Sequence, residues 1–215
     1  MKAENAYRSN KRRGSLFVVS APSGAGKTSL CRMLCNKTGG IKHSVSYTTR
    51  EPRNGEINDI DYTFIDKKEF LQMVREGEFI EWAEVYGNYY GTSARRIEEA
   101  ISAGIDIIMD IDTQGAKQLM EKKADATYIF ILPPSLEELR NRLVCRNTDS
   151  GEVISKRLQR AVKEIRDYNL YKYVIINDSI EYALDDLSAV VRSERCRMEK
   201  IDEIWIKETF LKEVG

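Results

Sequence analysis

This 215-residue sequence has one histidine, no CxxC cysteine pair, no net charge and no long apolar run, and each absence argues against a class of function. His43 is the single histidine, which disfavours chemistry built on a histidine base or on several histidine ligands. Four cysteines without a CxxC pair favour buried thiols in a reducing compartment over a zinc site or a disulfide framework.

The charge balance and the apolar pattern limit the partners of the chain. Lys+Arg and Asp+Glu both number 34, so the basic excess typical of general nucleic-acid binders is missing. No apolar run approaches the length of a membrane span, and no signal-peptide segment is evident. We therefore expect a cytoplasmic protein without nucleic-acid or membrane partners, while the sequence leaves open whether it forms a homo-oligomer.

The segment SAPSGAGKT at residues 20–28 has the context of a phosphate-binding loop. An apolar run precedes it and a helical pattern follows it, as the strand, glycine loop and helix of such a site require. Glycines let several backbone N–H groups converge on one anion, and the helix dipole adds positive potential there. An ordinary glycine-rich turn is the alternative. The pattern predicts contacts to ATP from Ala21, Pro22, Ser23, Gly24, Ala25, Gly26, Lys27, Thr28 and Ser29.

Three positions of this loop have specific expectations. Lys27 is expected to reach the β and γ phosphates, and the Thr28 hydroxyl to hold a magnesium ion. Ala21 stands where the usual pattern has its first glycine.

A second basic segment follows the first predicted helix. Residues 44–56 begin as a short strand and end in a turn at Pro52 and Asn54-Gly55. Arg50 and Arg53 flank the proline, which holds the backbone extended. Two guanidinium groups on a stiff loop can clamp a phosphate, and solvated surface arginines are the alternative.

Residues 62–92 have the pattern of a small mixed insertion with a helix at 67–75. Glu81 lies in the predicted strand 79–85, on the same face as Phe79 and Ala83. A carboxylate on an otherwise apolar face needs a partner, which is either an arginine of the protein or a ligand that donates hydrogen bonds.

The α/β alternation then resumes and predicts a parallel sheet. An apolar strand at 105–112 ends in Asp110 and Asp112, and in a doubly wound sheet this end faces the ligand crevice. Asp110 suits a second magnesium contact, whereas Asp112 suits the N-cap of the helix that begins near Thr113.

Residues 135–168 predict two helices around a polar turn, with basic side chains on both sides. In a triphosphate enzyme this hairpin indicates a lid, and a solvated charged face is the alternative. The combined pattern predicts an α/β fold: a P-loop three-layer core with a parallel sheet, a small mixed α+β insertion and a helical lid.

With these segments in place, the chain resembles the guanylate kinase family of nucleoside monophosphate kinases. The resemblance covers nearly the whole chain, from about Ser15 to Arg197. It implies Mg²⁺-dependent transfer of the γ-phosphoryl group of ATP to GMP, and to dGMP, in purine nucleotide metabolism. The most specific segments are SAPSGAGKT at 20–28, SYTTREPRNGE at 46–56, FIEWAEVYGNYYGT at 79–92, DID at 110–112 and VIIND at 174–178.

The resemblance also implies a division of the chain. We expect a flexible N-terminal arm, a catalytic domain built from a core with two inserted units, and a C-terminal helical tail. The ranges are 1–13 for the arm, 14–197 for the domain (core 14–44, 93–143 and 169–197; GMP-binding insertion 45–92; lid 144–168) and 198–215 for the tail.

The matching positions imply an acceptor site that reads guanine through a carboxylate. Guanine presents N1–H and a 2-amino group, which one carboxylate can accept together, while adenine would leave that carboxylate unpaired. The residues that match the phosphate contacts of GMP are Arg50, Arg53, Tyr62 and Tyr90. Those that match the guanine contacts are Ser46, Glu81 and Thr92, with Asp112 nearby.

The matching positions on the donor side are mostly basic. Arg142, Arg146 and Arg157 correspond to the arginines of the family's lid and donor site, and Asn177 to its contact with adenine. The predicted catalytic residues are Lys27, Arg50, Arg146 and Arg157, and the predicted metal ligands are Thr28 and Asp110.

The sequence departs from the family at two places, and two rival functions stay open. Cys145-Arg146-Asn147 replaces the usual glycine-containing lid sequence, and Asp59 replaces a common glycine. One rival is a guanylate-kinase-like module that binds peptides, against which Lys27 argues. The other is a kinase with a different acceptor, against which Glu81 argues.

Overall fold

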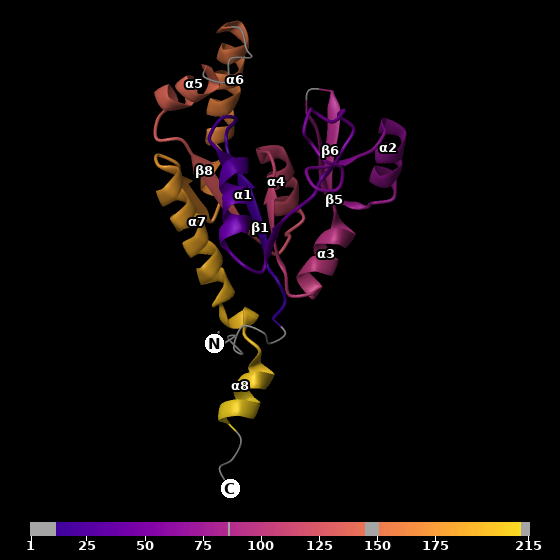
Figure 1. Cartoon of the computed structure of the whole chain (residues 1–215), viewed down its shortest axis with the longest axis vertical. Coiled ribbons are helices and arrows are strands. Elements are labelled where there is room, and N and C mark those ends of the chain that lie inside the picture. The colour runs from indigo at the N-terminus through magenta and orange to yellow at the C-terminus, as the bar shows by residue number, and fades with distance from the viewer. Residues whose placement is uncertain (1–11, 86, 145–150, 212–215) are drawn as a thin grey trace.

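The computed structural model describes residues 12–85, 87–144 and 151–211, and its centre is a five-stranded parallel sheet (Figure 1). The strands are β1 (Leu16–Ser20), β2 (Ile41–His43), β7 (Asp106–Asp110), β8 (Ala126–Leu132) and β9 (Tyr173–Ile176). Their order is β2-β7-β1-β8-β9, and every pairing is parallel. The central strand β1 therefore delivers the phosphate-binding loop to the middle of the carboxyl edge.

Helices cover both faces of this sheet. The covering helices are α1 (Lys27–Lys37), α3 (Ala94–Ser102), α4 (Thr113–Glu121) and α7 (Ile180–Arg195). Phe17 and Val19 of β1 pack in one core with α1 and α7, and Leu16 and Val18 pack in the other with α3 and α4. This alternation produces the predicted three-layer α/β core.

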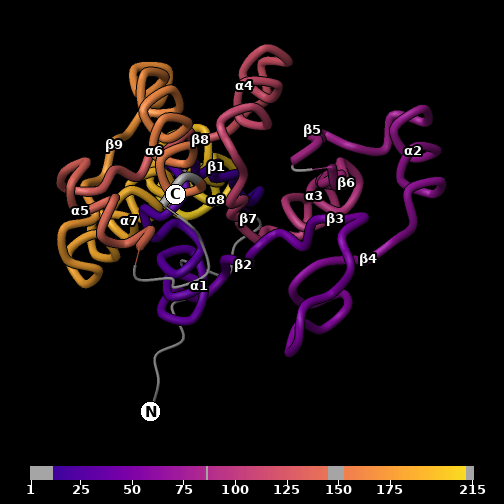
Figure 2. Tube along the Cα trace, turned by 90° about the horizontal axis from the view of Figure 1, so that it is seen from above, coloured from indigo at the N-terminus to yellow at the C-terminus, as the bar shows by residue number. Residues whose placement is uncertain are grey.

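A second, mixed sheet lies to one side of the parallel sheet (Figure 2). Its strands in spatial order are β4 (Thr63–Phe64), β3 (Tyr47–Thr48), β6 (Asn88–Ser93) and β5 (Phe79–Val85). Helix α2 (Lys67–Arg75) covers it through Phe70, whose ring stacks on Phe79 with centroids 4.6 Å apart. This unit is the mixed insertion that the sequence predicts.

A helical hairpin stands on the opposite side of the parallel sheet (Figures 1 and 2). It consists of α5 (Leu136–Val144) and α6 (Gly151–Ile165), and its connecting residues 145–150 lie outside the described part. Leu139, Leu143 and Ala161 form a small core between the two helices. The two helices therefore pack on each other through a small core of their own.

Three details differ from or extend the sequence-based expectations. Strand β2 is not predicted, because three residues are too few to show alternation. The strand expected within 44–56 is reduced to the two residues of β3. Asp59 has a φ of 60°, which explains the preference for glycine there, since only short polar side chains and glycine enter this region readily.

The N-terminal end of the described chain lies near the amino edge of the sheet (Figure 1). Arg12 and Arg13, the end of the predicted arm, form ion pairs of 2.8 Å with Asp106 and 2.7 Å with Glu98. After α7 the chain continues to α8 (Glu203–Phe210), which extends away from the sheet (Figure 1). No helix in the described part of the chain is long and apolar enough to cross a bilayer.

Candidate active site

The phosphate-binding loop turns between β1 and α1 on two glycines with left-handed backbone. Gly24 has a φ of 98° and Gly26 a φ of 91°. A Cβ at Gly24 would lie 3.0 Å from Cδ2 of Leu143, and one at Gly26 would lie 2.5 Å from Nδ2 of Asn177. Ala21, in contrast, is buried among core residues that accommodate its methyl group. The loop therefore requires glycine at 24 and 26 but not at 21.

Asn177 and Arg142 support this loop from the neighbouring elements. The Asn177 Nδ2 donates to the carbonyl of Ala25 at 2.7 Å. Arg142 donates through Nη2 to the carbonyl of Asn177 at 3.0 Å and through Nε to Glu138 at 2.8 Å. Helix α5 is thereby tied to the loop, and the predicted contact of Asn177 with adenine stays a prediction.

Thr28 and Asp110 meet at the carboxyl edge of the sheet. The Thr28 Oγ1 donates to Asp110 Oδ2 at 2.6 Å, and His43 Nε2 lies 3.2 Å from Asp110 Oδ1. Burial raises the pKa of Asp110, but Lys27, His43 and Thr28 outweigh it and hold that pKa well below its usual range. An ionised carboxylate beside a hydroxyl fits Mg²⁺, which takes one or two such protein ligands and completes its shell with phosphate and water.

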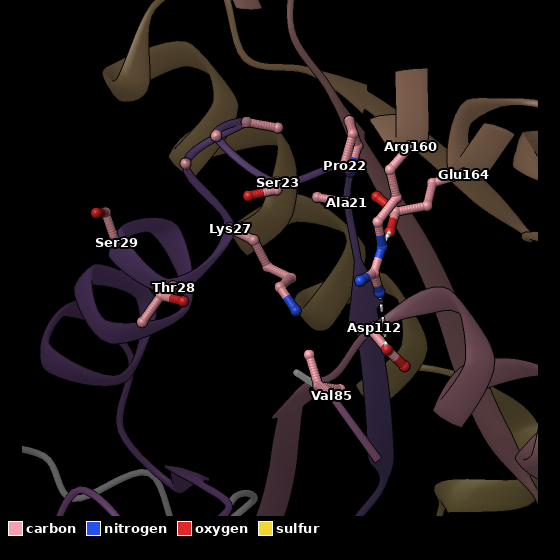
Figure 3. A pocket seen from close by; sticks show the side chains of 13 residues that line it. Ala21, Pro22, Ser23, Lys27, Thr28, Ser29, Val85, Asp112, Arg160 and Glu164 are labelled. Carbon is pink, nitrogen blue, oxygen red and sulfur yellow. Dashed lines mark hydrogen bonds and ion pairs between the residues drawn. The ribbon is translucent and has the colours of Figure 1, made fainter. Parts of the chain in front are cut away.

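A pocket of about 300 Å³ lies over the phosphate-binding loop (Figure 3). Lys27 points into it, and its Nζ donates to the carbonyl of Ile111 at 2.6 Å. Asp112 lines the same pocket and also caps α4, because its Oδ1 accepts the N–H of Gly115 at 2.9 Å. The capping role that the sequence predicts for Asp112 is thus present in the structure, together with a position in the pocket.

Helix α6 contributes Arg160 and Glu164 to the lining of the same pocket (Figure 3). The Arg160 Nη2 lies 3.6 Å from Asp112 Oδ2. Arg157 Nη2 donates to Ser23 Oγ of the loop at 2.8 Å. Of the predicted lid arginines, Arg157 thus reaches the phosphate-binding loop, while Arg146 lies outside the described residues.

Arg50 is the centre of a second cluster, on the mixed sheet. Its Nη2 donates to both carboxylate oxygens of Glu56, at 2.8 and 2.9 Å, and Glu56 also accepts the backbone N–H of Arg53 at 2.7 Å. The Arg50 guanidinium carbon lies 5.5 Å from the centroid of the Tyr62 ring, and the rings of Tyr62 and Tyr90 are 6.0 Å apart. The cluster already holds one oxyanion, which is the chemistry that a phosphate would offer.

The charges of the predicted metal ligands act on the side chains of the Arg50 cluster. Burial raises the pKa of Tyr62, and the negative charge of Asp110 raises it further. Hydrogen bonds from Arg50 and from the backbone of Arg53 lower the pKa of Glu56. The predicted acceptor and metal sites therefore lie close enough to interact electrostatically.

Glu81 is buried at the other end of the mixed sheet, with only 4% of its surface exposed. Its Oε1 accepts a hydrogen bond from Thr92 Oγ1 at 2.7 Å, and Ser46 Oγ lies 3.1 Å from the same hydroxyl. Because the Thr92 proton is directed to Glu81, Ser46 is the donor to Thr92. The three predicted base-reading residues, from three separate segments, thus form one hydrogen-bonded chain.

The environment of Glu81 makes its charge costly. Burial raises its pKa to about 7, the Thr92 hydrogen bond opposes that shift, and the nearby charge of Asp112 adds to it. Lys27 and Lys122 act in the opposite direction. A ligand that donates hydrogen bonds to Glu81 would therefore be bound strongly.

The sequence predicts no role for Glu56 or Glu164, and it places Arg160 only among the basic side chains of the predicted lid. Glu56 lies within the quoted segment 46–56, but its pairing with Arg50 across a turn has no periodic signature. Arg160 and Glu164 line the pocket from one face of α6, and their i, i+4 spacing was the available signal.

Comparisons with known proteins agree on one family. The family model described as guanylate kinase matches residues 13–194. A guanylate kinase of Geobacter metallireducens is 54% identical over 90% of this chain and 95% of its own length. One from Vibrio cholerae is 50% identical over 87% of this chain and 92% of its own length. The crystal structure of guanylate kinase from Anaplasma phagocytophilum, 36% identical, superposes with a TM-score of 0.76 over 94% of this chain and 98% of that one.

Proposed function

The chain belongs to the guanylate kinase family, and we propose how its own residues transfer the γ-phosphoryl group of ATP to GMP. The observation that carries the assignment is Glu81, a buried carboxylate with a raised pKa and a hydroxyl as hydrogen-bond partner. A group of this kind is costly to the fold unless a ligand satisfies it.

Glu81 selects guanine through hydrogen-bond complementarity. Its ionised carboxylate accepts the N1–H and the 2-amino group together, while Ser46 and Thr92 complete the contacts to the base. AMP offers neither donor and leaves the carboxylate buried and unpaired, a mismatch that supports large discrimination. Since these contacts involve the base and not the ribose, dGMP is accepted as well.

Arg50, Arg53, Tyr62 and Tyr90 bind the acceptor phosphate. Arg50 already holds a carboxylate, and its fork can turn toward a phosphate oxygen with little loss of order. The acceptor phosphate is largely dianionic near neutral pH, because its second pKa is about 6. A general base is therefore not required, and neutralising two anions is the main task.

The donor side consists of the phosphate-binding loop and helix α6. Backbone N–H groups of residues 23–28 hold the phosphates of ATP, and Lys27 exchanges the carbonyl of Ile111 for a phosphate oxygen. Mg²⁺ held by Thr28 and Asp110 would neutralise phosphate charge. Arg142, Arg146 and Arg157 act from the hairpin, and closure of hairpin and insertion excludes water from the reacting group.

The proposed division into core, GMP-binding insertion 45–92 and lid 144–168 follows from this mechanism. Both inserted units carry ligand contacts in this mechanism, and the two units lie on opposite sides of the phosphate-binding loop (Figure 2). Cysteines without a CxxC pair or disulfide framework fit a reducing compartment, so we assign the enzyme to the cytoplasm.

Glu81→Gln tests the assignment. The amide presents an N–H to guanine where an acceptor is needed, so the ratio of kcat/KM for GMP over AMP should fall about 100-fold or more. The measurement is a coupled ADP assay with GMP, dGMP and AMP. Glu84→Gln, on the exposed face of the same strand, is the matched control. Unchanged discrimination in Glu81→Gln would remove Glu81 from base reading.

A further inference from the structure

A bulge in β5 sets the direction of Glu81. Along β6, Ser93 and Thr92 are consecutive, but their partners on β5 are Phe79 and Glu81, so Ile80 is an extra residue. Such a bulge bends a strand and redirects the side chains that follow it. Glu81 thereby lies directly opposite Thr92, within reach of its hydroxyl.

Helix α4 anchors the backbone on both sides of Glu81. The side-chain amide of Gln118 donates to the carbonyl of Trp82 at 2.6 Å and accepts the N–H of Trp82 at 3.2 Å. Lys122, the C-cap residue of α4, donates through Nζ to the carbonyl of Ile80 at 2.7 Å. The residues before and after Glu81 are therefore both held by side chains of one helix, although no strand pairs with β5 on that edge in the described sheet.

Gly115 supplies the space for the Glu81 carboxylate. A Cβ at position 115 would lie 2.7 Å from Glu81 Oε2, closer than real Cβ contacts allow. Gly115 is buried in the first turn of α4 and has no left-handed backbone that would itself require glycine. The reason for glycine here is the carboxylate of another element, 34 positions earlier in the sequence.

We infer that Gly115, Gln118 and Lys122, one stripe of α4 at i, i+3 and i+7, form a specificity platform that positions Glu81 for guanine. This inference rests on the proposed function, in which Glu81 reads the base. The platform residues act on the nucleotide through Glu81 and are positioning residues. They lie along the core helix whose N-cap residue, Asp112, lines the pocket over the phosphate-binding loop. The position of Glu81 is therefore set by this core helix as well as by the mixed sheet.

Gly115→Ala separates positioning from folding. Alanine favours a helix over glycine, and the nearest atom that must move is the end of the Glu81 side chain and not backbone, so the unfolding midpoint should stay close to that of the parent. The displaced carboxylate should lower the kcat/KM ratio of GMP over AMP about tenfold or more, with KM for ATP within about twofold of the parent. Gly39→Ala is the matched control, because an added Cβ there meets nothing within 4 Å.

A double-mutant cycle that combines Gly115→Ala with Glu81→Ala completes the test. If Gly115 acts through Glu81, Gly115→Ala changes the ratio in the parent enzyme and leaves it unchanged when Glu81 is already alanine. Gln118→Ala should lower the same ratio in the parent enzyme, since it releases both backbone bonds of Trp82.

The failures are distinguishable. Should Glu81→Ala abolish discrimination while Gly115→Ala matches Gly39→Ala, the platform is refuted and the proposed function stands. An effect of Gly115→Ala that persists in the Glu81→Ala background also refutes the platform. Full discrimination in Glu81→Ala overturns both proposals.

Discussion

In the proposed mechanism, residues 20–28 form a donor loop from one stretch of chain, whereas the acceptor residues Ser46, Arg50, Glu81 and Thr92 come from separate segments. The donor loop works through backbone geometry, set by two left-handed glycines. The proposed acceptor end works through side chains that already have one partner within the protein, Glu56 for Arg50 and Thr92 for Glu81. A contiguous backbone site specifies phosphate in general, and a distributed side-chain site specifies one nucleotide.

Lys27→Ala is the substitution expected to impair the donor end most. Removing the ammonium from the transferring phosphate should lower kcat about 10³-fold, because that charge is needed most in the transition state. KM for GMP should change little, since the acceptor cluster is built elsewhere. Steady-state kinetics with both substrates varied, together with a thermal unfolding curve, measure these effects.

Lys37→Ala is the control for this variant. Lys37 is the last residue of the same helix, at the end opposite the loop, and pairs with Asp185 at 2.6 Å on the surface. Turnover of Lys27→Ala near that of Lys37→Ala would contradict the phosphate-loop assignment.

Arg50→Ala should impair the use of GMP and leave the binding of ATP unchanged. It removes the guanidinium that we propose binds the acceptor phosphate and leaves Glu56 without its ion-pair partner, so kcat/KM for GMP should fall about 100-fold. Calorimetric titration should give unchanged ATP affinity, and Arg50→Lys should be intermediate because a point charge replaces the fork.

The exposed Arg75 at the end of α2 gives the control, Arg75→Ala, within the same unit. A titration in which Arg50→Ala loses ATP affinity and keeps GMP affinity would move Arg50 to the donor side.

The contrast between the two ends also explains what the sequence could predict. The phosphate-binding loop, the strand that carries Glu81 and the helix α2 were predictable because each is encoded locally. The roles of Glu56 and Gly115 were not, because both depend on contacts across a turn or between a helix and a distant strand. Asn177 shows the same limit: its amide supports Ala25, which no local pattern indicates.

The smallest expected effect concerns the charge of Glu81. With a pKa of about 7, its ionised fraction rises from about a tenth at pH 6 to about nine tenths at pH 8. Guanine needs the ionised form, so GMP affinity should weaken about tenfold from pH 8 to pH 6. The same titration of Glu81→Gln is the reference, because the nucleotide phosphate ionises equally in both experiments and its effect can be subtracted.

Stability should follow the opposite trend, because the folded pKa of Glu81 lies above its unfolded value of 4.5. The protonated carboxyl contributes stability that is complete below pH 4.5 and is lost as the pH rises through 7. Without GMP, Glu81→Gln should therefore gain stability relative to the parent from pH 6 to pH 8, measured by urea unfolding at each pH. Equal pH dependence of both proteins, in binding and in unfolding, would mean that Glu81 titrates normally. Glu81 would then be ionised across this range of pH, so only its raised pKa would be refuted and its role in base reading would stand.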